Sequence, residues 1–223
     1  MGLYRSILLG SRLSLHSFAF ASNRVAIVQP TTRARVHSMA GDDGSGTYTY
    51  MYPRPAVTVD AALVTYDPVH PHILLIKRKN DPYAGKWALP GGFVDENEPL
   101  WSAAYRELEE ETSIPKSALR MPLRQVETFG DPGRDPRGWT VTVVYGAVVD
   151  PSVRELSKAA DDAAEAEWFD CSGGTLPDMA FDHDLVVHRV LEAVRDWKDT
   201  PDDLSRALGR CMPHFTGGVK NPE

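Results

Sequence analysis

The stretch WALPGGFVDENEPLWSAAYRELEEETSI, residues 87–114, decides how the chain is organised. Pro99 suits the first turn of a helix, because the N–H that proline lacks has no partner there in any case. Apolar residues then recur with the 3.6-residue period of a helix, which predicts a helix over 99–112 with one side against a sheet. The predicted apolar side consists of Leu100, Trp101, Ala104, Tyr105 and Leu108.

Acidic residues crowd the second half of this predicted helix. Glu107, Glu110 and Glu111 lie within about 100° of one another around the helix, so their charges repel. The helix dipole also disfavours negative charge at this end. A shared cation would remove both penalties, and Mg²⁺ prefers carboxylate oxygens, water and phosphate oxygens. A solvated acidic face is the other interpretation, but Arg106 lies among the carboxylates and a Gly-Gly pair precedes them, where we expect a tight turn that exposes a carbonyl oxygen.

Outward from this stretch, β-branched runs alternate with polar loops. Residues 56–66 predict a strand, and the apolar run 72–78 predicts a buried strand. A second amphipathic helix is predicted over 182–197. Strands on both sides of one central helix indicate a single α/β domain with a mixed sheet. Further strands are predicted at 86–90, 123–130, 140–149 and 165–170.

The two ends of the chain differ from this middle. Residues 1–41 hold five arginines, no lysine and no acidic residue, which is typical of a mitochondrial or chloroplast transit peptide; a disordered tail without an address is the other interpretation. We expect a transit peptide and linker over 1–45, the folded domain over 50–198, and a polar C-terminal tail without a strong pattern over 199–223. Translation from Met39 would give an untargeted, cytoplasmic form.

Composition argues against several classes of protein. Apolar residues make up 42% and charged residues 25%, and no apolar stretch approaches the roughly 20 residues that span a bilayer, so no membrane partner is expected. Without residues 1–41 the net charge falls from −7 to −12, which argues against nucleic-acid binding. Cys171 and Cys211 match no metal spacing and no disulfide framework.

The spacing around the acidic helix resembles a known motif. Glycine, five residues, glutamate, seven residues and then Arg-Glu-apolar-x-Glu-Glu-x-Gly-apolar form the Nudix box, which this chain matches at eight of nine positions over 23 residues. The matching residues are Gly92, Glu98, Arg106, Glu107, Leu108, Glu110, Glu111 and Ile114. Ser113 replaces the second glycine, which in the family ends the helix in a left-handed conformation. We expect some strain at Ser113, or a helix stopped by Pro115, and no loss of a metal ligand.

The resemblance implies a Nudix-type α/β/α sandwich with a mixed sheet over roughly residues 53–198. It also implies a hydrolase that cleaves the pyrophosphate of a nucleoside diphosphate linked to another moiety with the help of Mg²⁺ or Mn²⁺. By this resemblance, Glu107 and Glu111 are the principal metal ligands. Glu110 contributes to metal binding directly or through water, and the Gly91 carbonyl is a further ligand.

The remaining positions of the box have roles that the resemblance also implies. Arg106 orients the carboxylates, Glu98 anchors the turn or binds a second metal, and Gly92 lies at the substrate. The general base stays open, since some family members use a box glutamate, here Glu110, and ADP-ribose hydrolases can use a later loop. The candidates in that later loop are Asp161, Asp162 and Glu165; a solvated loop is the other interpretation of them.

Two further segments favour ADP-ribose as the substrate, cleaved to AMP and ribose 5-phosphate. FGDPGRDPRGWTV (129–141) resembles a loop of ADP-ribose pyrophosphatase-like Nudix proteins, where Arg134 and Arg137 would contact phosphate or ribose. The segment ending in LPDMAFDH resembles the same subgroup, and we interpret His183 as a helix-start residue rather than a catalyst. Three aromatic residues could stack on a base or belong to the core: Trp87, Tyr105 and Trp139.

Other functions remain open at this point. Another Nudix specificity would act on oxidised nucleoside triphosphates, FAD or dinucleoside polyphosphates. A non-catalytic Nudix domain would instead sense ADP-ribose and regulate transcription, but such relatives carry an added DNA-binding domain. We expect a nucleotide-type small molecule as the partner and no nucleic acid. A homodimer is a further expectation, because many relatives form dimers.

Overall fold

The computed structural model describes residues 50–67, 70–158 and 163–212. The predicted transit peptide and linker, the candidate bases Asp161 and Asp162, and the end of the predicted C-terminal tail lie outside the described residues. In the part of the chain that is described, no helix is both long and apolar enough to cross a membrane.

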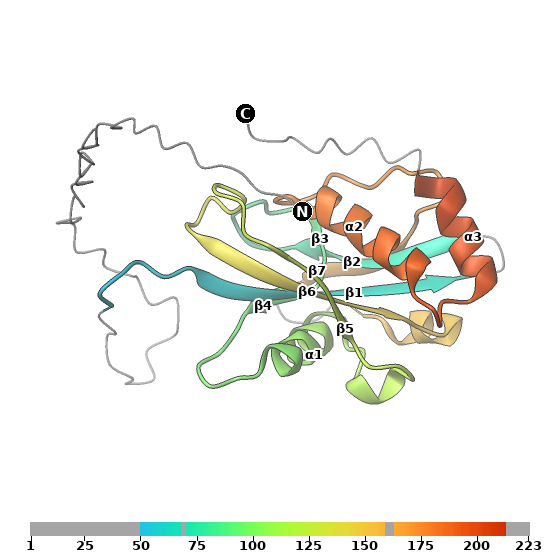
Figure 1. The fold of residues 1–223 in the computed structure, drawn as a ribbon, viewed down its shortest axis with the longest axis horizontal. Coiled ribbons are helices and arrows are strands. Elements are labelled where there is room, and N and C mark those ends of the chain that lie inside the picture. The colour runs from blue at the N-terminus through green and yellow to red at the C-terminus, as the bar shows by residue number, and fades with distance from the viewer. Residues whose placement is uncertain (1–49, 68–69, 159–162, 213–223) are drawn as a thin grey trace, which may run out of the picture. The chain divides into compact units, whose positions relative to one another are not determined.

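A mixed sheet lies at the centre of the domain (Figure 1). β1 (Ala56–Tyr66) and β6 (Thr140–Val148) pair in parallel from Ala56 opposite Thr140 to Val64 opposite Val148, and the other strand pairings are antiparallel. The remaining strands are β2 (Pro71–Arg78), β3 (Trp87–Ala88), β4 (Gly91–Phe93), β5 (Arg124–Phe129) and β7 (Ala163–Asp170). The strand order in the sheet is β3-β2-β1-β6-β5, with β4 beside β1 and β7 beside β2. The predicted mixed sheet is confirmed.

Helices cover both faces of this sheet (Figure 1). α1 (Leu100–Thr112) packs on one face against a core that includes Leu63 and Leu108. α2 (His183–Asp196) and α3 (Asp202–Cys211) pack on the other face. Alternate β1 side chains enter the two cores, as the period of two along a strand requires. The α/β/α sandwich is therefore confirmed; two short 3₁₀ helices, Lys116–Ala118 and Pro151–Leu156, complete the secondary structure described.

α3 lies in the segment for which the sequence showed no strong pattern. Its polar composition hides four small or apolar residues with helical spacing, and all four are buried. The helix extends the core beyond the predicted end of the domain, and the expectation of a pattern-free tail is wrong for these residues. The four are Leu204, Ala207, Leu208 and Cys211.

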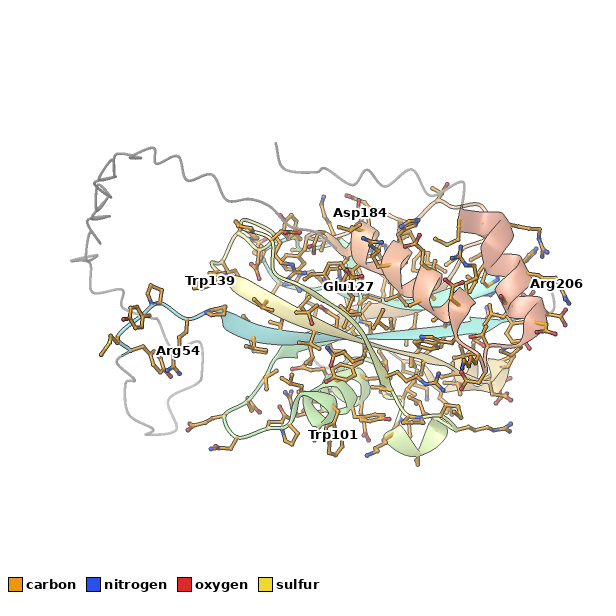
Figure 2. All side chains as sticks on the ribbon, in the orientation of Figure 1. Arg54, Trp101, Glu127, Trp139, Asp184 and Arg206 are labelled. Atoms are coloured by element: carbon orange, nitrogen blue, oxygen red, sulfur yellow. The ribbon has the colours of Figure 1, made fainter. Side chains whose placement is uncertain are left out.

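α1 agrees with its predicted bounds but differs in two details. Trp101 was placed on the side facing the sheet, yet 51% of it is exposed, and it lies on the outer side of the helix (Figure 2). Ala103 takes the buried place instead. Ser113 ends the helix with φ 61° and ψ 13°, and its N–H donates to the Glu109 carbonyl at 2.9 Å. Serine thus adopts the left-handed conformation in which the box normally has glycine.

Candidate active site

The candidate site forms where β4 pairs with β1. Asp60 lies opposite Gly91 and Val59 opposite Gly92. The predicted tight turn at the two glycines is wrong, since both belong to a strand and neither has a positive φ. Close approach explains the glycines instead: a Cβ at Gly91 would lie 2.3 Å from the Val59 carbonyl oxygen, and a Cβ at Gly92 would lie 2.4 Å from a carboxylate oxygen of Glu107.

Two carboxylates of α1 reach β4 from the face of the sheet that α1 covers. Glu111 is buried, and its Oε2 accepts the Gly91 N–H at 2.9 Å. Burial raises the pKa of Glu111 to about 8, and the nearby charge of Glu107 adds to this effect. Burial also raises the pKa of Glu107 above its ordinary value. The site therefore disfavours two adjacent negative charges, a penalty that a cation would relieve.

Arg106 connects the other acidic residues of the box. Its Nε and Nη2 donate to the two carboxylate oxygens of Glu98 at 2.9 and 2.8 Å. Its Nη1 donates to Glu107 at 2.8 Å and to Glu110 at 3.0 Å, and Nη2 also donates to the Phe93 carbonyl. Hydrogen bonding to Arg106 lowers the pKa of Glu98, which keeps that carboxylate ionised. This arrangement agrees with an orienting role for Arg106 and an anchoring role for Glu98.

The donor set fits a hard divalent cation in its chemistry. Glu107, Glu110, Glu111 and the Gly91 carbonyl supply only oxygen atoms, the ligands that Mg²⁺ and Mn²⁺ prefer. Among the residues that the structure describes, no three acidic, histidine or cysteine side chains converge on one point. Glu107 and Glu110 instead point toward Arg106.

A cavity of about 310 Å³ lies beside these carboxylates. Glu107, Glu111 and both glycines line it together with Arg78 and Arg106. A smaller cavity of about 50 Å³ adjoins it, because both include the two glycines. Negative carboxylates and positive guanidinium groups therefore face one space, as a metal ion and a phosphate group together require.

Both arginines predicted to bind substrate line the smaller cavity, but each has a carboxylate partner. The Arg134 side chain is almost fully buried and donates two hydrogen bonds to Asp182, at 2.7 and 2.9 Å. Arg137 binds Asp135, and its guanidinium lies 4.9 Å from the ring centre of Phe93. Arg137 also lines the larger cavity, so it is the better placed of the two for a phosphate.

The other predicted candidates do not line either cavity. Glu165 pairs with Lys77 at 3.0 Å on the exposed surface. Trp87 packs against Phe169, and the Tyr105 hydroxyl accepts the Leu123 N–H at 2.8 Å. Trp139 is 55% exposed at the start of β6 (Figure 2). None of these aromatic residues faces the site.

Several residues at the site were missed by sequence reasoning. Arg78 ends β2 and lines both cavities, while Asp60 and Phe181 line the smaller one. His183 begins α2, as predicted, but its buried ring also lines the smaller cavity. Sequence spacing could not reveal these residues, because strand pairing and the packing of α2 bring them together from distant segments.

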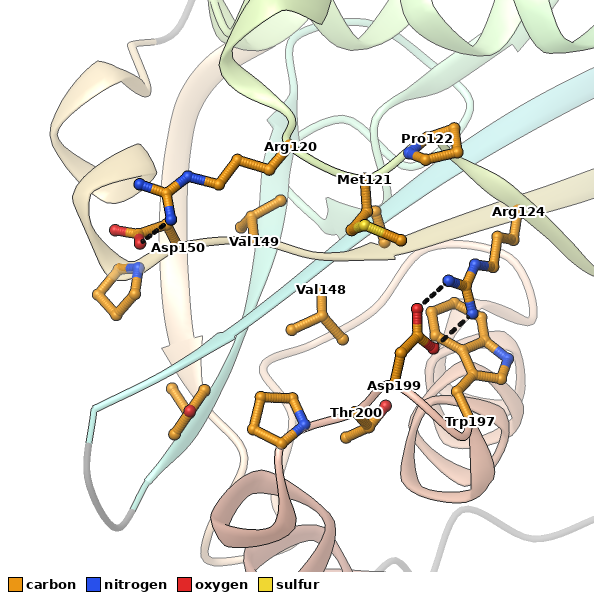
Figure 3. A pocket seen from close by; sticks show the side chains of 14 residues that line it. Arg120, Met121, Pro122, Arg124, Val148, Val149, Asp150, Trp197, Asp199 and Thr200 are labelled. Atoms are coloured by element: carbon orange, nitrogen blue, oxygen red, sulfur yellow. Dashed lines mark hydrogen bonds and ion pairs between the residues drawn. The ribbon is translucent and has the colours of Figure 1, made fainter.

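A separate cavity of about 250 Å³ lies at the opposite end of β1 and β6 (Figure 3). Trp197, Val148 and Met121 make it largely apolar. Its two carboxylates are already paired with arginines, Asp199 with Arg124 and Asp150 with Arg120, as the dashed lines in Figure 3 show. It contains none of the predicted site residues and is not the candidate active site.

Comparisons with known proteins agree with this geometry. The family model described as NUDIX domain matches residues 56–190. The ADP-ribose pyrophosphatase of Methanocaldococcus jannaschii is 43% identical over 61% of this chain and 73% of its own length. The ADPR responsive transcriptional repressor NtrR of Acinetobacter baylyi is 40% identical over 59% of this chain, which spans only 51% of that relative.

The chain is also similar to a solved structure of a protein named as an ADP ribose pyrophosphatase. The bifunctional NMN adenylyltransferase/ADP ribose pyrophosphatase of Francisella tularensis, complexed with AMP and a manganese ion, is 35% identical. It superposes with a TM-score of 0.53 over 63% of this chain and 42% of its own. The box residues, their placement beside β4 and the family match over most of the described domain lead to one conclusion: this chain belongs to the Nudix family and is a Nudix hydrolase.

Proposed function

We propose that this Nudix hydrolase cleaves ADP-ribose to AMP and ribose 5-phosphate, with Mg²⁺ or Mn²⁺ as its cofactor. One observation carries the proposal. The carboxylates of Glu107 and Glu111 both contact the Gly91–Gly92 strand at the wall of a cavity that three arginines also line. A pyrophosphate needs this combination, because its negative charge must be neutralised while water is brought to one phosphorus.

The reaction requires little covalent chemistry from the protein. A water oxygen bonds to one phosphorus, the P–O–P bridge breaks, and the two monophosphates separate. When bound, a divalent cation would neutralise phosphate charge and lower the pKa of the attacking water. Glu107, Glu111 and the Gly91 carbonyl would hold it, and Arg106 would keep the carboxylates oriented. Glu110, 44% of whose side chain is exposed, is our candidate to accept the proton from water.

The substrate assignment has two supports. The relative from Methanocaldococcus jannaschii and the structure from Francisella tularensis are both named as ADP-ribose pyrophosphatases, and the latter holds AMP, one of the two proposed products. In this chain, Arg78 and Arg137 line both cavities beside Gly92, where the phosphates and ribose of ADP-ribose would lie.

A substrate panel tests the proposal. We expect ADP-ribose to be cleaved with the highest kcat/KM among ADP-ribose, FAD, dinucleoside polyphosphates and 8-oxo-dGTP, each with Mg²⁺ or Mn²⁺. Glu111→Gln should lower kcat by about 100-fold or more, whereas the exposed Glu109→Gln on the same helix should have little effect. A panel with ADP-ribose at the bottom would overturn the substrate assignment.

Measuring both binding and cleavage of ADP-ribose decides between an enzyme and a sensor. The Acinetobacter baylyi relative responds to ADPR as a transcriptional repressor, so a related chain need not be an enzyme in the cell. Tight binding of ADP-ribose without cleavage, measured by calorimetry and product analysis, would favour the sensor.

Two further properties stay predictions. We propose that residues 1–45 direct the protein to a mitochondrion or chloroplast, and a fluorescent reporter fused to them should enter that organelle; diffuse cytosolic signal would contradict this. We also expect a homodimer, which light scattering of the purified protein would check.

A further inference from the structure

The three residues before and at the start of α2, which we name the 181–183 segment, lie against two separate walls of the proposed active site. The chain just before them pairs with β3: the Trp87 N–H donates to the Asp178 carbonyl at 3.0 Å, and the Ala180 N–H donates to the Trp87 carbonyl at 2.7 Å. The side chains of the 181–183 segment then contact both walls of the site.

His183 continues this pairing with its side chain. Its Nδ1 accepts the Leu89 N–H at 3.0 Å, which requires a neutral imidazole whose proton is on Nε2. Only 4% of the residue is exposed, so water cannot easily replace the bond. Leu89 lies two residues before Gly91, and a buried backbone N–H without a partner costs roughly 1–3 kcal/mol. The histidine therefore fixes the backbone that leads into β4.

Asp60 lies between the same ring and Gly91. Its Oδ1 lies 3.7 Å from His183 Nε2, and its Oδ2 accepts the Thr142 hydroxyl at 2.5 Å. A Cβ at Gly91 would lie 2.6 Å from Asp60 Oδ1. Glu111 of α1 contacts Gly91 from the other helical layer (Figure 1). Gly91 thus lies between side chains that come from the two helical layers on opposite faces of the sheet.

Asp182 and Phe181 contact the other wall. Asp182 binds Arg134 through two hydrogen bonds and so holds the loop between β5 and β6. The Phe181 ring lies 5.4 Å from the Arg137 guanidinium and 5.0 Å from that of Arg78. Phe181 has φ 54°, a conformation that an aromatic residue adopts only when its surroundings require it.

We propose that the 181–183 segment positions two walls of the site independently of each other. His183 positions β4 at Gly91, and Asp182 positions the loop between β5 and β6, which we call the arginine loop because it holds Arg134 and Arg137. Neither residue need touch the reacting atoms. This proposal rests on the proposed function where it concerns ADP-ribose. Its metal-binding test does not depend on the substrate, because Mn²⁺ affinity can be measured without any substrate.

The test uses two substitutions that each keep one side of the imidazole. His183→Asn retains an acceptor near the Nδ1 position for the Leu89 N–H, whereas His183→Gln retains a donor near Nε2 for Asp60. We expect His183→Gln to weaken Mn²⁺ binding by about 10-fold or more, and His183→Asn to stay within about 3-fold of the unchanged protein. Electron paramagnetic resonance of free Mn²⁺ in the full-length protein measures both.

Two control substitutions separate positioning from folding. Val190→Ala, in the buried side of α2, should lower the melting temperature without changing Mn²⁺ affinity. Asp182→Asn should raise the KM for ADP-ribose by about 10-fold, with kcat and Mn²⁺ affinity nearly unchanged, because the bond to Leu89 remains. The Asp182→Asn result also stands by itself if His183→Gln fails to fold.

Five outcomes would contradict a part of these proposals. Wild-type Mn²⁺ affinity in a folded His183→Gln protein overturns the role of His183, as does equal weakening in both His183 variants. A loss of Mn²⁺ affinity in Asp182→Asn overturns the separation of the two walls. An unchanged protein that binds Mn²⁺ but leaves ADP-ribose intact overturns the proposed substrate alone, while one that binds no Mn²⁺ overturns the metal site and this inference together.

Discussion

Glycine is required at positions 91 and 92 for two different reasons, although both residues lie in one short strand. At Gly91 the atom in the way of a side chain is a backbone oxygen of Val59, which cannot move without disturbing the sheet. At Gly92 it is the end of the Glu107 side chain, which can move. Glycine at position 91 is therefore required by the pairing of the strands, and glycine at position 92 by the placement of the Glu107 carboxylate.

This difference predicts opposite results for the two alanine substitutions. Gly91→Ala should lower the free energy of unfolding by about 1–3 kcal/mol, because the added methyl meets the backbone. Gly92→Ala should leave unfolding nearly unchanged but displace the Glu107 carboxylate and weaken Mn²⁺ binding by about 10-fold or more. Urea unfolding and Mn²⁺ titration of both variants measure the two effects. A Gly92→Ala protein with normal metal affinity would contradict the assignment of Glu107 as a ligand.

The two cysteines illustrate the effect of burial on a thiol. Burial raises the pKa of Cys171 to about 12, and burial also raises that of Cys211. Since the thiolate is the reactive form, we expect both thiols to react with Ellman's reagent only after unfolding at pH 8. In native protein the absorbance change should be slow, and guanidinium chloride should make it immediate. Rapid reaction of either thiol in the native protein would show that the segment around that cysteine opens readily.

At the scale of a single element, the end of α1 stores strain that the family pattern avoids. Ser113 adopts a left-handed conformation, which costs a residue with a Cβ roughly 1–2 kcal/mol relative to its preferred one. A glycine at this position would remove that strain, but it would also give the unfolded chain more conformational freedom, which offsets part of the gain in stability.

Ser113→Gly should therefore stabilise the protein by roughly 0.5–1 kcal/mol. Ser113→Ala, which keeps the Cβ, should bring no gain. Thermal and urea unfolding of the three proteins compare these values, and a stability that falls with glycine would mean that the serine side chain makes a compensating contact.

α3 contributes to the core although its sequence is mostly polar. Leu208 is fully buried in the layer formed with α2. Leu208→Ala should lower the free energy of unfolding by about 2–5 kcal/mol. The exposed Arg206→Ala on the same helix should change it by no more than about 0.5 kcal/mol. If Leu208→Ala is neutral in chemical unfolding, α3 does not belong to the cooperative unit of the domain.

For the whole molecule, the sequence predicted the layers and most elements because their signals are local. The 3.6-residue period over 99–112 and the β-branched run at 56–66 each lie within one segment. The family resemblance implied that Glu107, Glu111 and the Gly91 carbonyl share a metal ion, and the two carboxylates do lie beside the glycines. α3 escaped prediction because only a few of its residues carry the apolar period.

The parts of the site that could not be predicted depend on contacts between distant segments. Arg134 and Arg137 were found as candidates, but their carboxylate partners were not. The arginine loop resembled a substrate loop, whereas nothing in its sequence indicated that Asp182 would hold it. His183 was recognised as a helix start, and its contact with Leu89 became visible only in the fold.

The contact between His183 and Leu89 has a consequence for the kinetics of folding. It joins residues 94 positions apart, and the hydrogen bond of Thr142 to Asp60 joins residues 82 positions apart. Closing such long loops costs entropy before any contact compensates for it, so these contacts form late. A refolding chain should regain the circular dichroism signal of its helices before it can bind Mn²⁺. A newly made chain would then pass through a stage at which its helices are present and its catalytic capacity is still absent.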